Sequence, residues 1–413
     1  MEKLAIYGGE KVKTTPFGTG KRFGKEELKH LEEALNQNTL FYWYGKKVKE
    51  LNAKFADMYG MKHCVATSSG TAALHTALGA CGVTAGDEVI TSPITDMGTI
   101  IGIIYQQAVP IFADVDPHTY NITAESIEKC ITDRTKAILV VHLAGTAADM
   151  DPIMEVARKH NIKVIEDCAQ AYMTYYKGRL AGTIGDIGCF SLNDFKHISA
   201  GDGGMCITND DELFERAWKF TDKNYSRVGT GVGKSIEFIA PNYRMSELVG
   251  AVGIAQLDRV EEICRKRNIA GEKITAGIKD LKGIYPPVVA EGDKSSYWFY
   301  LFRVNEEELG TDTDTFIEAV NAEGVFCKKG YIASCVYEYD MFKTKTGLEN
   351  SHAPFVSSYY DKEVNYDKGL CPVAEEVLST SVQIIISEFY TDEDVEAQIK
   401  AIRKVATYFN NKK

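Results

Sequence analysis

The sequence predicts an α/β protein, with a mainly parallel sheet in its first two thirds and a smaller α+β unit in its last third. Between His63 and Glu166, short apolar runs alternate with segments whose apolar residues recur at helical spacing. That alternation is typical of parallel strands joined by helices. After about Glu262 strands and helices separate along the chain. A chain of 413 residues is long for one domain, so we expect two, residues 1–261 and 262–413.

Each expected element rests on a local pattern. Leucines at helical spacing predict a helix over 28–35, and Val48, Leu51 and Phe55 predict another that reaches residue 58. Strands are expected at 63–67, 88–91, 110–114, 135–142, 162–166 and 189–192, with helices at 72–81, 99–107, 124–130 and from Asp151 onward. Further helices are expected over 214–220, from 248 and over 395–409, with strands near 297–304 and 381–386.

Composition argues against several classes of function. The chain carries 47 Lys and Arg against 58 Asp and Glu, a formal net charge of -11, without a basic block. We therefore expect no binding to nucleic acid or to an anionic membrane. No apolar run approaches the ~20 residues of a membrane span, and the first residues lack a signal-peptide core. The ten cysteines form no CxxC pair, so we expect reduced thiols, no metal and a cytoplasmic location.

One lysine stands out. Lys196 lies between a strand-like run at 189–192 and the sequence Gly-Asp-Gly-Gly at 201–204. Glycines permit turns and close approaches that other residues do not make, so they indicate a loop shaped around a ligand. A desolvated lysine in such a loop is able to form a Schiff base with a carbonyl such as that of pyridoxal phosphate. The alternative is an exposed lysine beside a β-turn.

Two further patterns suit a phosphorylated cofactor. At Ser69-Gly70-Thr71 a strand runs into the start of a helix, where N–H groups, hydroxyls and the helix dipole favour phosphate. An ordinary N-cap is the alternative. Asp167 follows the strand at 162–166, and a carboxylate at the carboxyl end of a parallel strand would pair with the ring nitrogen of pyridoxal phosphate. A capping or turn aspartate is the alternative there.

An aromatic run and a glycine-rich run are less specific. Residues 41–44 are Phe-Tyr-Trp-Tyr, which wall a ligand or subunit contact or pack beneath a loop. Tyr42, Trp43, Tyr44 and Arg227 are therefore candidate substrate contacts. The sequence GTGVGK at 229–234 is similar to part of a P-loop but lacks the GxxxxGK[ST] spacing, so we do not expect it to bind nucleotide.

Taken together, the motifs resemble the DegT/DnrJ/EryC1/StrS family of pyridoxal-phosphate enzymes. The matching segments, in order, are GGEKV, SSGTAALHTAL, PIFADVDPHTYNI, VVHLAGTAADMDPI, VIEDCAQAY, GRLAGTIGDIGCFS, GDGGM, PNYRMSELVGAVGIAQL and CPVAEEV. The resemblance implies the fold of type I pyridoxal-phosphate transferases, with a seven-stranded sheet in the large domain and a smaller carboxyl-terminal domain. It also implies a homodimer whose active sites lie at the subunit interface.

The resemblance further implies roles for single residues. Lys196 would carry the cofactor as a Schiff base, Asp167 would pair with the ring nitrogen, and Gln170 would contact the ring hydroxyl. The phosphate group would be held by Gly70, Thr71 and Ser191, next to Ser69, and by Asn242 of the partner subunit. The chain departs from the family at Asp96, where an aromatic side chain usually stacks on the ring, and at Asn193, in the segment before the lysine.

The expected reaction is transamination from glutamate or glutamine to a keto-sugar, often nucleotide-linked, or to a keto-cyclitol. Two alternatives remain open at this point. One is a pyridoxal-phosphate lyase, dehydratase or cyclase, which the polar residues Asp96 and Asn193 favour because they bring polar groups toward the pocket. The other is a non-catalytic sensor that keeps the fold.

Overall fold

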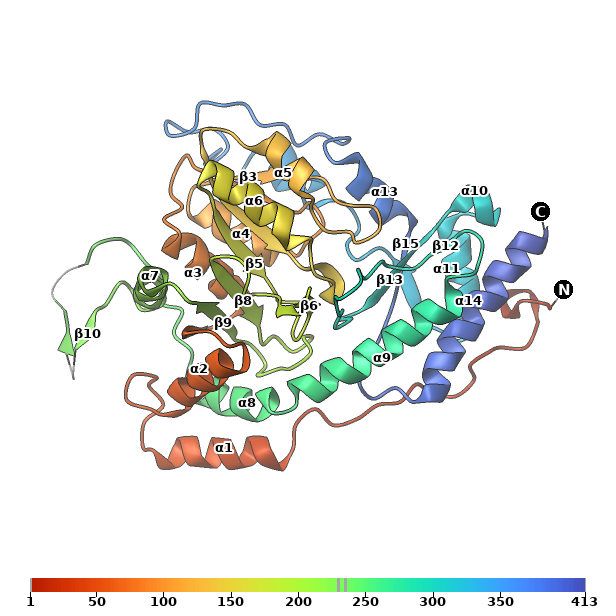
Figure 1. Cartoon of the computed structure of the whole chain (residues 1–413), viewed down its shortest axis with the longest axis horizontal. Helices are drawn as coiled ribbons and strands as arrows, with labels where there is room; N and C mark the ends of the chain where they lie inside the picture. Colours follow the sequence, from red (N-terminus) through yellow and green to blue (C-terminus); the bar gives the residue numbers. More distant parts are fainter. Residues whose placement is uncertain (1, 229–230, 234–235, 413) are drawn as a thin grey trace.

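The computed structural model describes residues 2–228, 231–233 and 236–412. At its centre is a seven-stranded sheet (Figure 1). Its strands, from one edge to the other, are β1 (His63–Thr67), β9 (Gly204–Thr208), β8 (Ile187–Ser191), β5 (Lys163–Asp167), β4 (Thr135–Val141), β2 (Glu88–Thr91) and β3 (Val109–Phe112). Only β9 among these strands runs antiparallel to its neighbours. The predicted mainly parallel sheet is confirmed.

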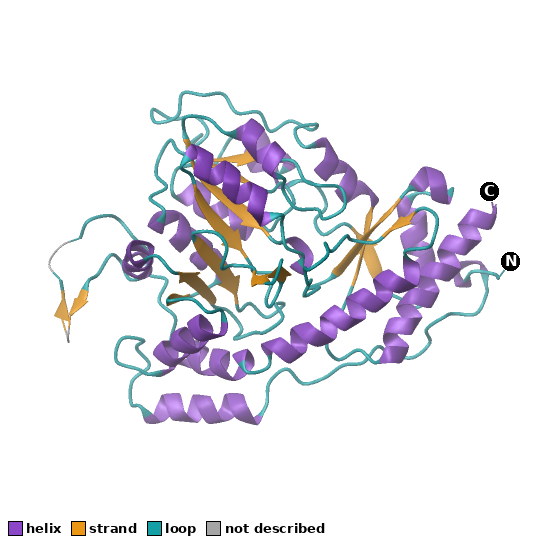
Figure 2. Ribbon diagram, in the orientation of Figure 1, coloured by secondary structure: helices purple, strands orange, loops and turns teal. Residues whose placement is uncertain are grey.

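Helices cover both faces of this sheet (Figure 2). They are α3 (Gly70–Ala80), α4 (Met97–Tyr105), α5 (Ala124–Cys130), α6 (Met150–His160), α7 (Asp211–Thr221) and α8 (Glu247–Leu257). Successive side chains of β4 point to opposite faces, so Ile138 packs in one core cluster with Ile153 of α6 and Leu139 packs in another with Leu78 of α3. Because both faces are covered, the central strands are apolar on both sides.

A second, antiparallel sheet organises the smaller lobe, as expected. Its strands, in order, are β12 (Ile284–Tyr285), β13 (Tyr300–Val304), β15 (Ser381–Ile384) and β14 (Cys327–Lys329). They pack with α9 (Val260–Ile278), α11 (Thr313–Ala322) and α14 (Asp392–Lys412). The predicted boundary at residues 261 and 262 falls inside α9, which runs from the larger lobe to the smaller one (Figure 1).

Two segments cross between the lobes. The amino-terminal residues lie along the smaller lobe, where Leu4 is part of the core and Lys13 pairs with Asp394 (Figure 1). Conversely, residues 335–378 pack against the large sheet, where the Tyr360 hydroxyl donates to Glu88. These crossings tie the two lobes together.

The remaining elements are short or peripheral. They are α1 (Lys25–Asn36), α2 (Lys47–Met58), α10 (Glu306–Leu309), α12 (Asp340–Lys343), α13 (Pro372–Thr380), the pairs β6 (Tyr175–Tyr176) with β7 (Arg179–Leu180) and β10 (Arg227–Val228) with β11 (Gly231–Val232), and three 3₁₀ turns at Ala5–Tyr7, Leu143–Gly145 and Val336–Glu338. The β10–β11 pair lies on an arm that projects from the body (Figure 1). None of the described helices is long and apolar enough to cross a membrane.

Glu323 anchors the amino-terminal segment. Its buried carboxylate accepts hydrogen bonds from the backbone N–H groups of Ala5 and Val12 and pairs with Lys404 at 2.9 Å. Removing one member of a buried ion pair is costly in stability, because the charge that remains is still buried but has lost its closest counter-charge.

We expect Glu323→Ala to lower the free energy of unfolding by about 3 kcal/mol, because it leaves Lys404 buried without this carboxylate. Urea denaturation followed by circular dichroism measures the loss. The control is Glu125→Ala, which breaks an exposed pair with Lys129 and should change little. A loss no larger than that of the control would contradict the anchoring role.

Candidate active site

Lys196 lies in a loop that leaves the carboxyl end of β8. Asn193 shapes this loop: its side-chain oxygen accepts from the Phe195 N–H at 3.2 Å, and its amide nitrogen donates to Asp202 at 3.2 Å. The Lys196 N–H donates to the Asn193 carbonyl at 3.0 Å. Both polar ends of Asn193 are therefore used to form the turn. This accounts for its presence before the lysine without a role in the reaction.

The structure brings Lys196 and Asp167 together. Burial lowers the pKa of Lys196, and the charges of Asp167 and Asp96 act in the opposite direction. Burial raises the pKa of Asp167, partly offset by hydrogen bonds from the Ala169 N–H at 3.0 Å and the Thr99 hydroxyl at 2.8 Å and by the charge of Lys196. Within the described chain no cation is bonded directly to Asp167. It is a buried carboxylate whose two hydrogen-bond donors are both neutral groups.

The predicted phosphate-binding turn at residues 69–71 lies next to Lys196 and Asp167. Ser69 caps α3, and its hydroxyl accepts from the Ala72 N–H at 3.0 Å. The first N–H groups of a helix have no acceptor within it. Gly70 lies tightly against Ser191, since a Cβ on Gly70 would come within 2.6 Å of the Ser191 Cβ. Thr71 faces Gly98 of α4 in the same way, 2.7 Å from an added Cβ. The predicted residues Ser69, Gly70, Thr71 and Ser191 therefore form one cradle.

Asp96 has a structural explanation. It is the N-cap of α4, and its carboxylate accepts from the Gly98 N–H at 2.8 Å. The neighbouring Thr95 hydroxyl is 2.6 Å from that of Thr99, which in turn donates to Asp167. The Thr95-Asp96 pair thus fixes the start of α4 and supports the buried carboxylate.

Aromatic side chains reach the lysine from the smaller lobe, which the sequence patterns did not reveal. The Lys196 ammonium lies 3.9 Å from the centre of the Trp298 ring. Tyr331 stacks on Phe299 and meets Trp298 edge-on, with ring centres 5.1 and 5.9 Å apart. Burial raises the pKa of Tyr331, as do the charges of Asp96 and Asp167, and Gln170 is a hydrogen-bond partner. No local motif marks Trp298, because it lies about a hundred residues from the lysine along the chain.

Gln170 is also fixed by the large lobe. Its side-chain oxygen accepts from the Ala144 N–H at 2.8 Å in the turn at Leu143–Gly145. That contact leaves the amide nitrogen to donate. Gln170 is 4% exposed and lies three residues after Asp167, so the structure places it with the predicted site.

The candidate substrate contacts form a separate group at the base of the arm. The Tyr42 hydroxyl donates to Asp222 at 2.7 Å, and Arg227 and Arg244 both pair with the same buried carboxylate. Burial and Asp222 raise the pKa of Tyr42. The other two candidates follow Tyr42 in the chain: Trp43 packs on Trp218, and Tyr44 is exposed. Asn242, which was expected to contact the cofactor of the partner subunit, is exposed at the foot of the arm. Part of the GTGVGK run lies outside the described residues.

A buried cluster of His142, Glu166 and Cys168 has the donor atoms of a metal site. The His142 ring accepts from the Ala148 N–H through Nδ1, so Nε2 carries the proton and donates to Glu166 at 2.9 Å. Glu166 also accepts three backbone N–H groups, from Gly182, Ile184 and Gly185. These bonds lower its pKa against the effect of burial. Because His142 and Glu166 are already saturated, the cluster is structural.

We expect Zn²⁺ and chelators to leave the thermal midpoint of the protein unchanged, because a metal would have to break the hydrogen bonds of His142 and Glu166. Differential scanning fluorimetry with Zn²⁺ and with EDTA measures this. Stoichiometric metal that survives EDTA dialysis, detected by elemental analysis, would contradict the structural role.

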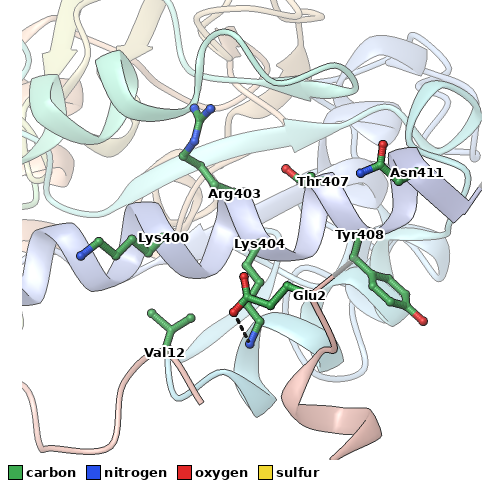
Figure 3. A pocket seen from close by; sticks show the side chains of 8 residues that line it. All are labelled: Glu2, Val12, Lys400, Arg403, Lys404, Thr407, Tyr408 and Asn411. Atoms are coloured by element: carbon green, nitrogen blue, oxygen red, sulfur yellow. Dashed lines mark ion pairs between the residues drawn. The ribbon is translucent and has the colours of Figure 1, made fainter. Parts of the chain in front are cut away.

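A cavity of about 550 Å³ lies elsewhere, between α14 and the amino-terminal residues (Figure 3). Two of the cations that line it are engaged in ion pairs: Lys404 pairs with Glu2 at 3.5 Å and with Glu323, while Arg403 points away (Figure 3) and pairs with Asp280. No nucleophile or buried carboxylate of the lysine site lines it. This cavity is therefore separate from the lysine site.

The chain is similar to known proteins over most of its length. Residues 21–403 match the DegT/DnrJ/EryC1/StrS aminotransferase family. A Micromonospora echinospora relative, whose name describes an L-glutamine:3-amino-2,3-dideoxy-scyllo-inosose aminotransferase, is 32% identical over 417 residues, 98% of this chain and 97% of that one. A GDP-perosamine synthase of Caulobacter vibrioides is 39% identical over 288 residues, 68% of this chain and 75% of that one.

A solved structure has the same fold over nearly the whole chain. The X-ray structure of an aminotransferase from Psychrobacter cryohalolentis superposes with a TM-score of 0.84 at 32% identity, covering 96% of this chain and all of that one. The architecture expected from the resemblance is thereby confirmed. The chain belongs to the DegT/DnrJ/EryC1/StrS aminotransferase family.

Proposed function

We propose that this protein binds pyridoxal phosphate through Lys196 and transfers an amino group from glutamate or glutamine to a keto-sugar or keto-cyclitol. The observation that carries the proposal is the meeting of a desolvated lysine and a buried carboxylate beside the cradle of residues 69–71 and 191. The names of the relatives support the substrate class, since one refers to a nucleotide-linked sugar and another to a cyclitol and L-glutamine.

The residues present fit the cofactor. Asp167 has a raised pKa because it is buried without a directly bonded cation, and a protonated ring nitrogen would supply one. Position 70 requires glycine because Ser191 occupies the space of a Cβ there. The first backbone N–H groups of α3 have no acceptor within the helix, and they would bind a phosphate group. Gln170 would offer its amide nitrogen to the ring hydroxyl, because its oxygen is already bonded to Ala144.

The chain's own groups supply the proton transfers. Burial lowers the pKa of Lys196, so its neutral amine exists at a lower pH than that of an exposed lysine and can take the proton from the donor's Cα at Nζ. Asp167 would hold the ring nitrogen in its protonated form, steadied by Thr99 and the Ala169 N–H. Bound pyridoxal phosphate supplies the electron sink that stabilises negative charge on the carbon that loses the proton.

We further propose that the active form is a homodimer with shared sites, working in the cytoplasm. Large apolar side chains on the surface support the proposal that a second copy of the chain binds there. Phe195, beside the lysine, is 79% exposed, and Leu28 and Leu35 of α1 are 66% and 61% exposed. Asn242 is exposed at the foot of the projecting arm, where it would reach the partner's phosphate group. All ten cysteines are free, which suits a reducing compartment.

We expect Lys196→Ala to lower turnover with glutamate or glutamine by roughly 10²–10⁴-fold, because it removes the proton-transfer group. Borohydride reduction followed by peptide mass spectrometry should find the cofactor on Lys196 in the wild type and not in the variant. Lys177→Ala is a matched control, since Lys177 also lies over an aromatic ring, 4.7 Å from Tyr176, and should keep full turnover. Cofactor recovered on another lysine would sink the assignment.

A mixed dimer tests whether Asn242 serves the partner subunit. We expect Lys196→Ala and Asn242→Ala homodimers to be strongly impaired, whereas a purified hybrid of the two has one site with both native residues. That hybrid should therefore regain about half of the wild-type turnover, measured with glutamate at low cofactor concentration. If Asn242 acts on its own subunit, both hybrid sites carry a defect and turnover stays at the level of the homodimers.

A further inference from the structure

Four consecutive backbone carbonyls around the lysine are held by two remote side chains. Arg22 donates from one guanidinium nitrogen to the Asp194 carbonyl and from another to those of Lys196, at 2.5 Å, and His197, at 3.3 Å. The carbonyl of Phe195 accepts from the indole N–H of Trp298 at 2.7 Å. Every backbone carbonyl of the segment 194–197 is thus hydrogen-bonded to Arg22 or Trp298.

Arg22 is itself fixed to the large lobe. Its own carbonyl accepts from Gln256 at 2.7 Å and from Arg259 at 2.5 Å, near the junction of α8 and α9. A guanidinium offers five N–H donors in a rigid fork, which suits several carbonyls that lie side by side. Lysine, with a single nitrogen, does not reproduce that geometry.

Trp298 is fixed to both lobes, and its backbone N–H donates to the Ala144 carbonyl of the large lobe at 2.9 Å. Its carbonyl accepts from Arg267 of α9 at 3.1 Å, and Arg267 binds Glu388 through two nitrogens at 3.0 and 2.8 Å. The ring of Trp298 lies 3.9 Å from the Lys196 ammonium. One side chain therefore contacts both the backbone before the lysine and the lysine's reactive nitrogen.

Other contacts hold the end of this segment more than its tip. His197 is fully buried, with its Nε2 3.1 Å from the Ser296 carbonyl, and the Asp194 carboxylate accepts from the Ser199 hydroxyl at 3.1 Å. The side chains of Asp194 and Phe195 are exposed, and Lys196 and Phe195 donate backbone N–H groups only to Asn193 of the same turn. Contacts within a turn do not fix its place on the protein. The links from Arg22 and Trp298 supply that fixed frame, and misplacement of a reacting group by about 1 Å costs up to 10²-fold in rate.

We propose that Arg22 and Trp298 are positioning residues that together fix the Lys196 backbone and aim its amine at the cofactor site. This rests on the proposed function of Lys196. It assigns a role to the amino-terminal segment and to the smaller lobe: each supplies one of the two holds.

The test uses Arg22→Gln, which removes the charged fork of donors, and Trp298→Phe, which removes the indole N–H donor, with Arg22→Lys in case the first variant fails to fold. Phenylalanine keeps an aromatic face for the ammonium, so Trp298→Phe isolates the loss of the indole hydrogen bond. The control is Arg216→Gln, because Arg216 also binds two consecutive carbonyls, of Gly79 and Ala80, away from the lysine.

The first measurement is the pH dependence of Lys196 labelling in the cofactor-free protein, with a limiting acylating ester and peptide mass spectrometry. Asp167 and Asp96 are the carboxylates that act on Lys196, and both remain in every variant. We expect the midpoint of labelling to rise toward the ~10.4 of an exposed lysine, because a loosened loop relieves the burial that lowers this pKa. Above that midpoint, where the amine is neutral in every variant, labelling should be several-fold faster because the ester reaches the amine more easily.

The second measurement is the rate at which pyridoxal phosphate attaches to Lys196. Each variant should be at least about ten-fold slower than the control, and the double variant should fall short of the product of the two effects because both act on one loop. Labelling and attachment indistinguishable from Arg216→Gln would overturn the inference. No attachment even in the wild type would instead contradict the proposed function, and the labelling result would still decide whether Arg22 and Trp298 hold the loop.

Discussion

The site depends on keeping an amine and a carboxylate out of water at one edge of a parallel sheet. Asp167 ends β5, and Lys196 follows β8, its parallel neighbour. The same edge gathers the start of α3 because β1 lies in the same sheet. Parallel strands deliver their carboxyl ends to one side, so residues far apart in the chain meet there without further arrangement. Burial then shifts both pKa values toward the neutral forms.

Burial of these groups has a stability cost that the surroundings limit. Asp167 keeps two hydrogen bonds, one through Thr99 from a helix that Asp96 caps. Behind the same strand, Glu166 is saturated by His142 and three backbone N–H groups. Neighbouring residues of β5 thus carry two buried carboxylates, one satisfied and structural, the other left with capacity for a cation. Alternation along the strand separates the two roles.

The smaller lobe takes part in the site. Trp298 and Tyr331 come from this lobe, and they place aromatic surface beside the lysine where Asp96 provides none. Arg22 comes from the amino-terminal segment, whose preceding residues run along the same lobe. The long helix α9 joins these parts, since Arg259, at its start, and Arg267 bind the two holding residues. The lysine is therefore supported from both lobes.

Sequence patterns were sufficient to predict the main features of the large lobe and the positions of its candidate site residues. These patterns were the alternation of strands and helices from residue 63, the glycine-rich run after Lys196, and the polar residues Ser69 and Asp167 at strand ends. These are local signals, because periodicity, caps and turns act over a few residues. Trp298, Tyr331 and Arg22 carry no such signal, and the roles of Asp96 as a cap and Asn193 as a turn residue emerged only from their contacts. The exposure of Leu28 and Leu35 was equally invisible, since helical spacing marks a face without saying what covers it. What the sequence determined was which residues carry chemistry; which side chains surround and hold them was decided by tertiary packing, because those contacts join segments hundreds of residues apart.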